Sequence, residues 1–138
     1  MTLKEFFKGD RFAVLAGCEL VEIRNGYARA CMTVKDEHLN GGDVCQGGAL
    51  FTLADLAFAA AVNSHLVLTV STSANISFFR SVPLGTTVTA EARELVDHHR
   101  MPYAEVRLTD QQGQLVALFT SSGYRKQNVR LEGVEPAE

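Results

Sequence analysis

Residues 38–63 read HLNGGDVCQGGALFTLADLAFAAAVN, and this stretch decides the fold. Its second half is rich in alanine and unbranched apolar residues, which favour a helix. The pair Gly47-Gly48 marks where that helix begins, and the polar segment before it, which contains Gly41-Gly42, is typical of a loop. The stretch therefore predicts a glycine-containing loop that leads into one long helix ending near Asn63.

Strand-like segments flank this helix on both sides. Before it, residues 19–24 and 27–34 are joined by Asn25-Gly26, a dipeptide that favours a tight hairpin turn. After it, further strand-like runs cover residues 66–79, 86–96, 103–109 and 115–124. A hairpin, one helix and a meander predict an α+β domain over residues 1–138, in which an antiparallel sheet wraps a single helix. The end of the chain, from about residue 127 to 138, is expected to be a flexible tail.

Composition and charge exclude several classes of protein. The 138 residues are 46% hydrophobic and 21% charged, which suits one domain with a real core. A net charge of -3 supplies no cationic surface, so neither nucleic acid nor a membrane is expected as a partner. Cys18, Cys31 and Cys45 fit neither a disulfide framework nor a zinc motif. Reduced thiols, a cytoplasmic location without a signal peptide, and no bound metal are therefore expected.

A single charge lies in the apolar middle of the chain. Residues 44–79 carry one formal charge, Asp55, although 21% of the whole chain is charged. Asp55 is too far along the helix to cap it, and its helical neighbours include no cation. Two interpretations are open: a carboxylate hydrogen-bonded to a neighbouring strand, or a carboxylate that serves as a base or nucleophile.

The start of the helix is a candidate oxyanion hole. Free N–H groups and the positive end of the helix dipole meet there, and Gly47 and Gly48 carry no Cβ to keep a ligand oxygen away. Gly47 and Asp55 are separated by about 12 Å of helical rise, too far to touch one small reacting centre. If both serve one site, the helix start of one subunit faces Asp55 of another in an obligate two-fold dimer.

The stretch quoted above resembles the central motif of hotdog-fold acyl-CoA thioesterases, most closely the phenylacetate-degradation (PaaI-like) branch. Asn40-Gly41, Gly47-Gly48, Leu53-Ala54-Asp55 and Ala57-Phe58-Ala59 stand in register with that motif. The resemblance implies a hotdog fold and hydrolysis of a small or aromatic acyl-CoA to the free acid and coenzyme A. It also implies no cofactor beyond that substrate, and a homodimer that pairs again into a dimer of dimers.

The resemblance assigns roles to individual residues. It implies that the N–H of Gly47 polarises the thioester carbonyl while Asp55, from the other subunit, attacks it or activates water. Asn40 matches a loop position that holds the substrate or the water. Ser73 matches a hydroxyl that orients the water in some members, although it also belongs to an alternating face typical of a solvent-exposed strand.

Three further positions belong to the predicted site: Gly48 and Arg80 for substrate binding, and Gln46 among the catalytic residues. Gly48 lies beside Gly47 at the helix start, and Arg80 could meet the phosphates of coenzyme A. Gln46 stands where the family usually has histidine. It keeps a donor and an acceptor but cannot become a cation. This departure leaves an alternative function open, a non-catalytic protein that binds or senses acyl-CoA.

Two enzymatic alternatives have weaker support. Cys45, beside the helix start, could be a nucleophile, but no histidine or aspartate accompanies it at a recognisable spacing. A thioester dehydratase of the same fold usually carries histidine in a His-Phe-Pro context, which this sequence lacks. The acyl group, and the choice between an anhydride and a general-base route, cannot be read from the sequence.

Overall fold

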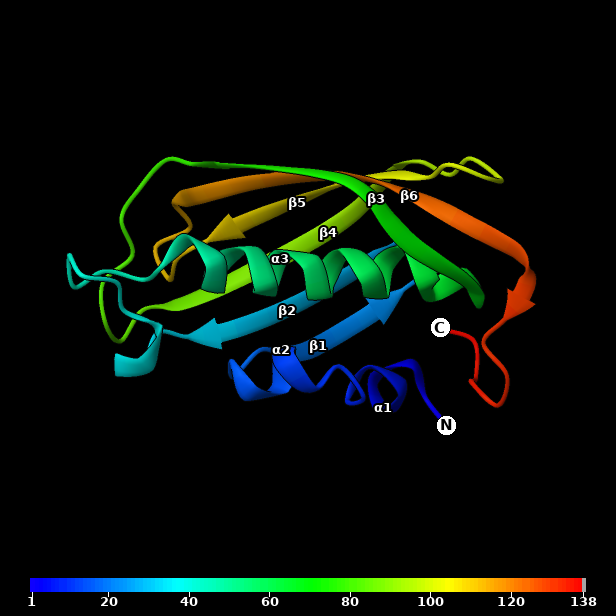
Figure 1. Ribbon diagram of the computed structural model, residues 1–138, viewed down its shortest axis with the longest axis horizontal. Coiled ribbons are helices and arrows are strands. Elements are labelled where there is room, and N and C mark those ends of the chain that lie inside the picture. The colour runs from blue at the N-terminus through cyan, green and yellow to red at the C-terminus, as the bar shows by residue number, and fades with distance from the viewer. Residues whose placement is uncertain (138) are drawn as a thin grey trace.

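A six-stranded antiparallel sheet wraps around one long helix, α3 (Gly47–Val62), as Figure 1 shows. The computed structural model describes residues 1–137. The strand order is β1-β2-β4-β5-β6-β3, so β1 and β3 are the edges of the sheet. The strands are β1 (Glu19–Arg24), β2 (Tyr27–Thr33), β3 (Val67–Phe78), β4 (Thr87–Val96), β5 (Tyr103–Thr109) and β6 (Leu115–Arg130).

The remaining elements are short. Helices α1 (Leu3–Phe7) and α2 (Arg11–Leu15) lie beside the β1 end of the sheet, and α1 packs against β1. Two 3-10 turns flank α3: η1 (Asp36–His38) before it and η2 (Asn63–His65) after it. This arrangement is the predicted one, an antiparallel sheet around a single helix.

Small side chains let the sheet approach α3 closely. Ala54, Ala57 and Ala60 are fully buried on the helix, and alanines of β2 and β4 are equally buried opposite them. Phe58 of α3 packs against Phe119 of β6, with ring centroids 6.0 Å apart. By length and composition the segment Gly47–His65 could cross a membrane, but most of it is buried inside this domain. The apolar run is therefore the core of the fold.

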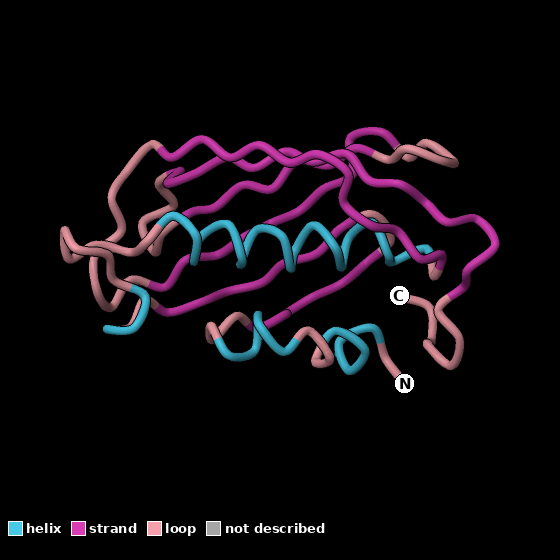
Figure 2. Tube along the Cα trace, in the orientation of Figure 1, coloured by secondary structure: helices cyan, strands magenta, loops and turns pink. Residues whose placement is uncertain are grey.

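The loops before α3 and after β3 lie side by side at the end of the domain where α3 begins (Figure 2). The N–H of Cys45 donates to the carbonyl of Val82 at 2.8 Å, and Val44 forms an isolated bridge with Pro83. These contacts fix the loop from which α3 starts.

The hairpin prediction is confirmed, while the prediction for the C-terminus is partly wrong. Gly26 has φ 69°, which the predicted turn requires. The last strand does not end near Tyr124 but continues to Arg130, and Leu131, only 9% exposed, donates its N–H to Leu66 at 2.9 Å. The expected flexible tail therefore does not begin at residue 127, because this segment pairs with and packs on the start of β3.

Candidate active site

The first turn of α3 presents two free backbone donors. Gln46 is the N-cap residue, and its N–H donates to the carbonyl of His38 at 2.8 Å. Ala49 donates to the carbonyl of Gln46 at 3.0 Å. Between them, the N–H groups of Gly47 and Gly48 have no hydrogen-bond partner within residues 1–137. Free donors at the positive end of a helix of 16 residues can stabilise negative charge on a ligand oxygen.

Two neighbouring side chains pack closely against the glycines of this turn. A Cβ on Gly47 would lie 2.8 Å from Cζ of Phe78, and one on Gly48 would lie 2.6 Å from Oε1 of Gln46. Gly47 also lines a cavity of about 400 Å³ that Phe78 and Arg80 share. The structure thus brings Arg80 to the helix start, at the opposite side of the turn from Gln46.

Asp55 lies in the third turn of α3 as a half-buried carboxylate. Across the described part of the chain it makes no hydrogen bond and no ion pair. Burial raises the pKa of Asp55, and repulsion from Asp10 raises it further. The interpretation in which Asp55 is bonded to a neighbouring strand is therefore wrong. An unpartnered carboxylate held in an apolar wall has the properties of a general base or a nucleophile.

A single protomer does not bring Asp55 to the free donors. Both belong to the same uninterrupted helix, in which eight residues correspond to about 12 Å of rise. Asp55 also lines neither of the two cavities at the helix start. The two groups can meet at one reacting centre only if a second copy of the chain supplies one of them.

Asn40 and Ser73 occupy different surroundings. Oδ1 of Asn40 accepts from Gly42 at 2.9 Å and from Val44 at 3.3 Å, so this side chain shapes the loop before α3. Its amide NH₂ is not used by the loop and remains able to donate. Ser73 is exposed on the edge strand β3, paired with Ser122 beside a bulge. Within one chain, neither residue lines a cavity with Gly47.

Cys45 does not have the properties of a nucleophile. Its thiol is buried, and burial raises its pKa, which disfavours the reactive thiolate. Sγ contacts the carbonyl of Gln46 at 3.6 Å. Cys45 is therefore a small core residue beneath the loop.

His38 has a structural role that the sequence does not reveal. This buried side chain joins two segments: Nδ1 accepts from the N–H of Lys35 at 2.8 Å, and Nε2 lies 2.6 Å from the carbonyl of Ala16. Because Nδ1 accepts, the hydrogen-bond network assigns the proton to Nε2, which donates to Ala16. With its own carbonyl bound to Gln46, His38 links the end of α2 to the start of α3. The quoted motif contains His38, but no local pattern indicates a partner 22 residues away.

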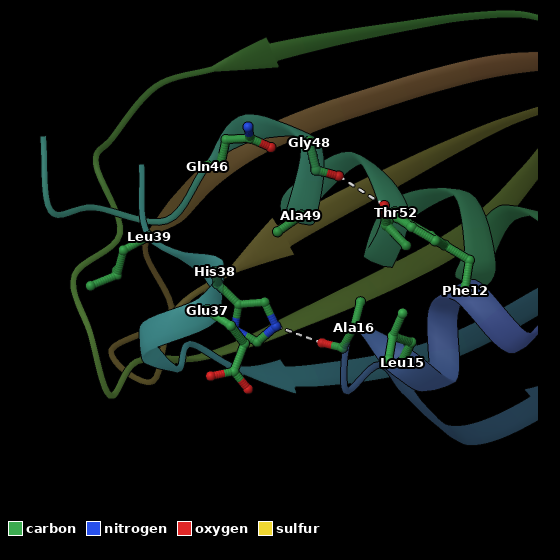
Figure 3. Close-up of a pocket in the computed structure, with 10 residues that line it drawn as sticks. All are labelled: Phe12, Leu15, Ala16, Glu37, His38, Leu39, Gln46, Gly48, Ala49 and Thr52. Atoms are coloured by element: carbon green, nitrogen blue, oxygen red, sulfur yellow. Dashed lines mark hydrogen bonds between the residues drawn. The ribbon is translucent and has the colours of Figure 1, made fainter. Parts of the chain in front are cut away.

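A cavity of about 540 Å³ lies on the other side of the helix start, between α2, η1 and α3 (Figure 3). It is lined by Phe12, Leu15, Ala16, Glu37, His38, Leu39, Gln46, Gly48, Ala49 and Thr52. Both Gln46 and Gly48 face it, so this cavity adjoins the free donors.

A second polar cluster lies at the opposite end of α3. Glu94, with a side chain only 5% exposed, contacts Nε2 of His65 at 2.5 Å and the Arg125 guanidinium at 3.2 Å. Arg125 also binds Asp97 at 2.9 Å. Burial raises the pKa of Glu94, while His65 and then Arg125 act in the opposite direction. Because a guanidinium already neutralises these carboxylates, the cluster is an ion-pair network that joins η2, β4 and β6.

Comparisons with known proteins show what the chain is similar to. The sequence model of the Thioesterase superfamily matches residues 42–117. Acyl-coenzyme A thioesterase PaaI of Escherichia coli K12 is 34% identical over 119 residues, which are 86% of this chain and 85% of that protein. A putative esterase of Archaeoglobus fulgidus is 35% identical over 119 residues, covering 86% of this chain and 77% of its own.

Solved structures share the fold. The E. coli PaaI protein from the phenylacetic acid degradation operon superposes with a TM-score of 0.85 at 34% identity, covering 88% of each chain. The protein smu.793 of Streptococcus mutans UA159, solved bound to acetyl CoA, superposes with a TM-score of 0.76 at 26% identity, covering 79% of this chain and 88% of its own. The predicted fold is thereby confirmed.

Proposed function

The chain belongs to the thioesterase superfamily, in its PaaI-like hotdog branch, and we propose that it hydrolyses a small or aromatic acyl-CoA to the free acid and coenzyme A. One observation carries the proposal: a half-buried, unpartnered Asp55 shares a helix with the free donors of Gly47 and Gly48. Thioester hydrolysis needs both a donor for the developing oxyanion and a base or nucleophile.

In this proposal Gly47 supplies the oxyanion hole. Its N–H, reinforced by that of Gly48, faces the thioester oxygen, which becomes negative when the carbonyl carbon turns tetrahedral. A backbone donor fixed in a helix needs no reorganisation as this charge develops. The free NH₂ of Asn40, in the loop that the helix start follows, holds the substrate or the attacking water.

Asp55 supplies the attack on the carbonyl carbon. As a base, its carboxylate takes a proton from water while the water oxygen bonds to that carbon, and the coenzyme A thiolate leaves with the electrons of the C–S bond. As a nucleophile, it bonds to the carbon itself, the coenzyme A thiolate leaves with the electrons of the C–S bond, and water then hydrolyses the resulting anhydride to the free acid and ionised Asp55. Both routes begin with ionised Asp55, and in both Ser73 is proposed to orient the water.

A two-fold homodimer is part of this mechanism. The separation along α3 requires Asp55 of one subunit to face Gly47 of the other, which creates two equivalent sites. The edge strand β3 supports this assembly, because within residues 1–137 it pairs only with β6 and its outer backbone groups form a template for a second β3. Further pairing into a dimer of dimers remains an expectation from the family.

Arg80 and Gln46 are proposed to bind the two parts of the substrate that the thioester joins, coenzyme A and the acyl group. Arg80 is exposed beside Gly47, where its guanidinium can pair with a phosphate of coenzyme A. The side-chain amide of Gln46 makes no hydrogen bond within residues 1–137 and remains available to the acyl part. A cytoplasmic location remains a prediction, in keeping with three free cysteines.

The test is coenzyme A release from a panel of short, long, phenylacetyl and hydroxybenzoyl thioesters. Native protein is compared with Asp55→Asn, which is nearly isosteric, and with Asp55→Ala. Multiple turnovers by the native protein that both variants lose support the proposal. Undiminished hydrolysis by folded Asp55→Asn would remove Asp55 from the mechanism.

One observation favours a second candidate function. Gln46 replaces the histidine usual in the family, so a protein that binds acyl-CoA without turning it over is the alternative. Tight binding measured by calorimetry, with no coenzyme A released from any thioester, would favour this alternative.

A further inference from the structure

The cavity between α2 and the start of α3 has the size and position of an acyl-binding pocket (Figure 3). Its volume of about 540 Å³ lies within the range of about 300–1,000 Å³ that is usual for small-ligand pockets. Gln46 and Gly48 form one wall, so the cavity adjoins the helix start, while Gly47 lines the cavity on the other side of that turn. A group that enters it would still be attached to a carbonyl at the helix start.

Most polar atoms of this pocket are already satisfied by the protein. Both ring nitrogens of His38 are engaged, and the hydroxyl of Thr52 donates to the carbonyl of Gly48 at 2.8 Å. The Glu37 carboxylate is directed away from Gln46 (Figure 3). Among the lining residues, the uncommitted polar groups at the helix start are therefore the side-chain amide of Gln46 and the N–H of Gly48. A pocket of this kind selects apolar groups, because a polar ligand would lose its water without gaining partners.

The outer wall consists of two large apolar side chains that are exposed in a single protomer. Phe12 is 67% exposed and Leu15 is 81% exposed, although both belong to the five-residue helix α2. Their position is fixed from both ends: Asp10 caps α2 by accepting from Ala13 at 3.1 Å, and His38 binds the carbonyl of Ala16. Exposed apolar side chains on a fixed support at the mouth of a pocket gain free energy only when something covers them.

We propose that this cavity binds the acyl group of the substrate, that the acyl group is an apolar alkyl or aryl group, and that Phe12 and Leu15 determine acyl specificity. The inference rests on the proposed function and deepens it. Helix α2 lies outside residues 42–117, the part that matches the superfamily. Acyl selection is thereby assigned to a segment separate from the chemical machinery on α3.

The experiment compares acetyl-, hexanoyl- and phenylacetyl-CoA as substrates of the full-length protein. Because Phe12 and Leu15 are exposed, Phe12→Ala and Leu15→Ala leave the core intact, and thermal melting verifies this. Val14→Ala is the matched control, since Val14 lies on the same helix and is 54% exposed but does not line the cavity. For hexanoyl- and phenylacetyl-CoA, kcat/KM is expected to fall about tenfold in each pocket variant. Acetyl-CoA hydrolysis and the control are expected to stay within about twofold of the native protein.

Equal losses for all three acyl groups, or no loss in either pocket variant, would overturn the inference. Failure of the proposed function is separated by a binding measurement with S-hexyl-coenzyme A, a thioether that cannot be hydrolysed. If Phe12→Ala weakens binding of this thioether about tenfold but leaves binding of coenzyme A unchanged, the pocket assignment holds even when no thioester is turned over. If both ligands bind Phe12→Ala and the native protein equally well, the pocket assignment is wrong.

Discussion

Replacing Gly47 with proline tests the oxyanion hole by removing a single N–H. Proline is tolerated at the first position of a helix, which Gly47 occupies in α3. The preceding residue must be extended, and Gln46 already has φ -63° and ψ 139°. The helix should therefore still form. Loss of one oxyanion donor is expected to lower kcat about 10²- to 10³-fold, or roughly 2.7–4 kcal/mol of barrier.

The proline ring also adds a Cβ, and the structure shows what it meets. The Cβ would lie 2.8 Å from Cζ of Phe78, so any side chain at position 47 displaces this ring. Gly47→Ala adds the same Cβ but keeps the N–H, which makes it the matched control. Phe78→Ala opens the space, because Phe78 is an exposed residue at the end of β3. The difference between Gly47→Pro and Gly47→Ala, measured with Phe78→Ala present in both, therefore isolates the donor.

The assay is single-substrate kinetics of coenzyme A release, with thermal melting and size-exclusion chromatography on each variant. The reasoning is refuted if the proline variant is folded and has the native oligomeric state, yet turns over within about threefold of the alanine variant. A difference of that size is far below the value of one oxyanion donor.

Three further variants give testable predictions. Asp55→Asn should lower kcat about 10²- to 10⁴-fold while acyl-CoA binding persists. It should also raise the melting temperature at pH 7: the native pKa of Asp55 is raised, so its contribution to stability is present below the unfolded pKa and is lost as pH rises through the native pKa. Asp10→Asn keeps the cap on Ala13 but removes a charge that raises the pKa of Asp55, so the acidic limb of kcat/KM should move to lower pH. Arg125→Met should lower the free energy of unfolding in urea by up to about 3–5 kcal/mol, because the buried Glu94 then keeps only His65 as a partner, and adding Glu94→Gln should restore part of the loss.

The elements that the sequence predicts well are those whose signal is local. The glycine pair marks the start of α3, and Asn25-Gly26 marks the first turn, because both depend on backbone preferences of adjacent residues. The end of β6 depends instead on distant partners. Residues 125–130 look polar and unstructured, but Arg125 is buried because Glu94 and Asp97 approach it from another strand.

The candidate site is predicted only in part for the same reason. Asp55 stands out as a lone charge in an apolar run, a signal that is visible in the sequence alone. The sequence does not show that Phe12 and Leu15 form pocket walls, because both look like ordinary residues of an amphipathic helix. They become lining residues only because His38 binds the carbonyl of Ala16 and brings α2 to the start of α3. Side-chain contacts of this range have no periodic pattern from which they could be read.

In the proposed mechanism, the half-buried position of Asp55 meets two opposing demands on a catalytic carboxylate. A fully exposed aspartate is ionised at neutral pH but is a weak base, because water stabilises its charge. A fully buried and unpaired aspartate would be protonated and could neither take a proton nor attack. Asp55 lies between these limits, where burial raises its pKa and no cation within residues 1–137 pairs with its charge. Deeper burial or an added cation would each remove reactivity, so the apolar neighbours of Asp55 contribute to the chemistry as well as to the core.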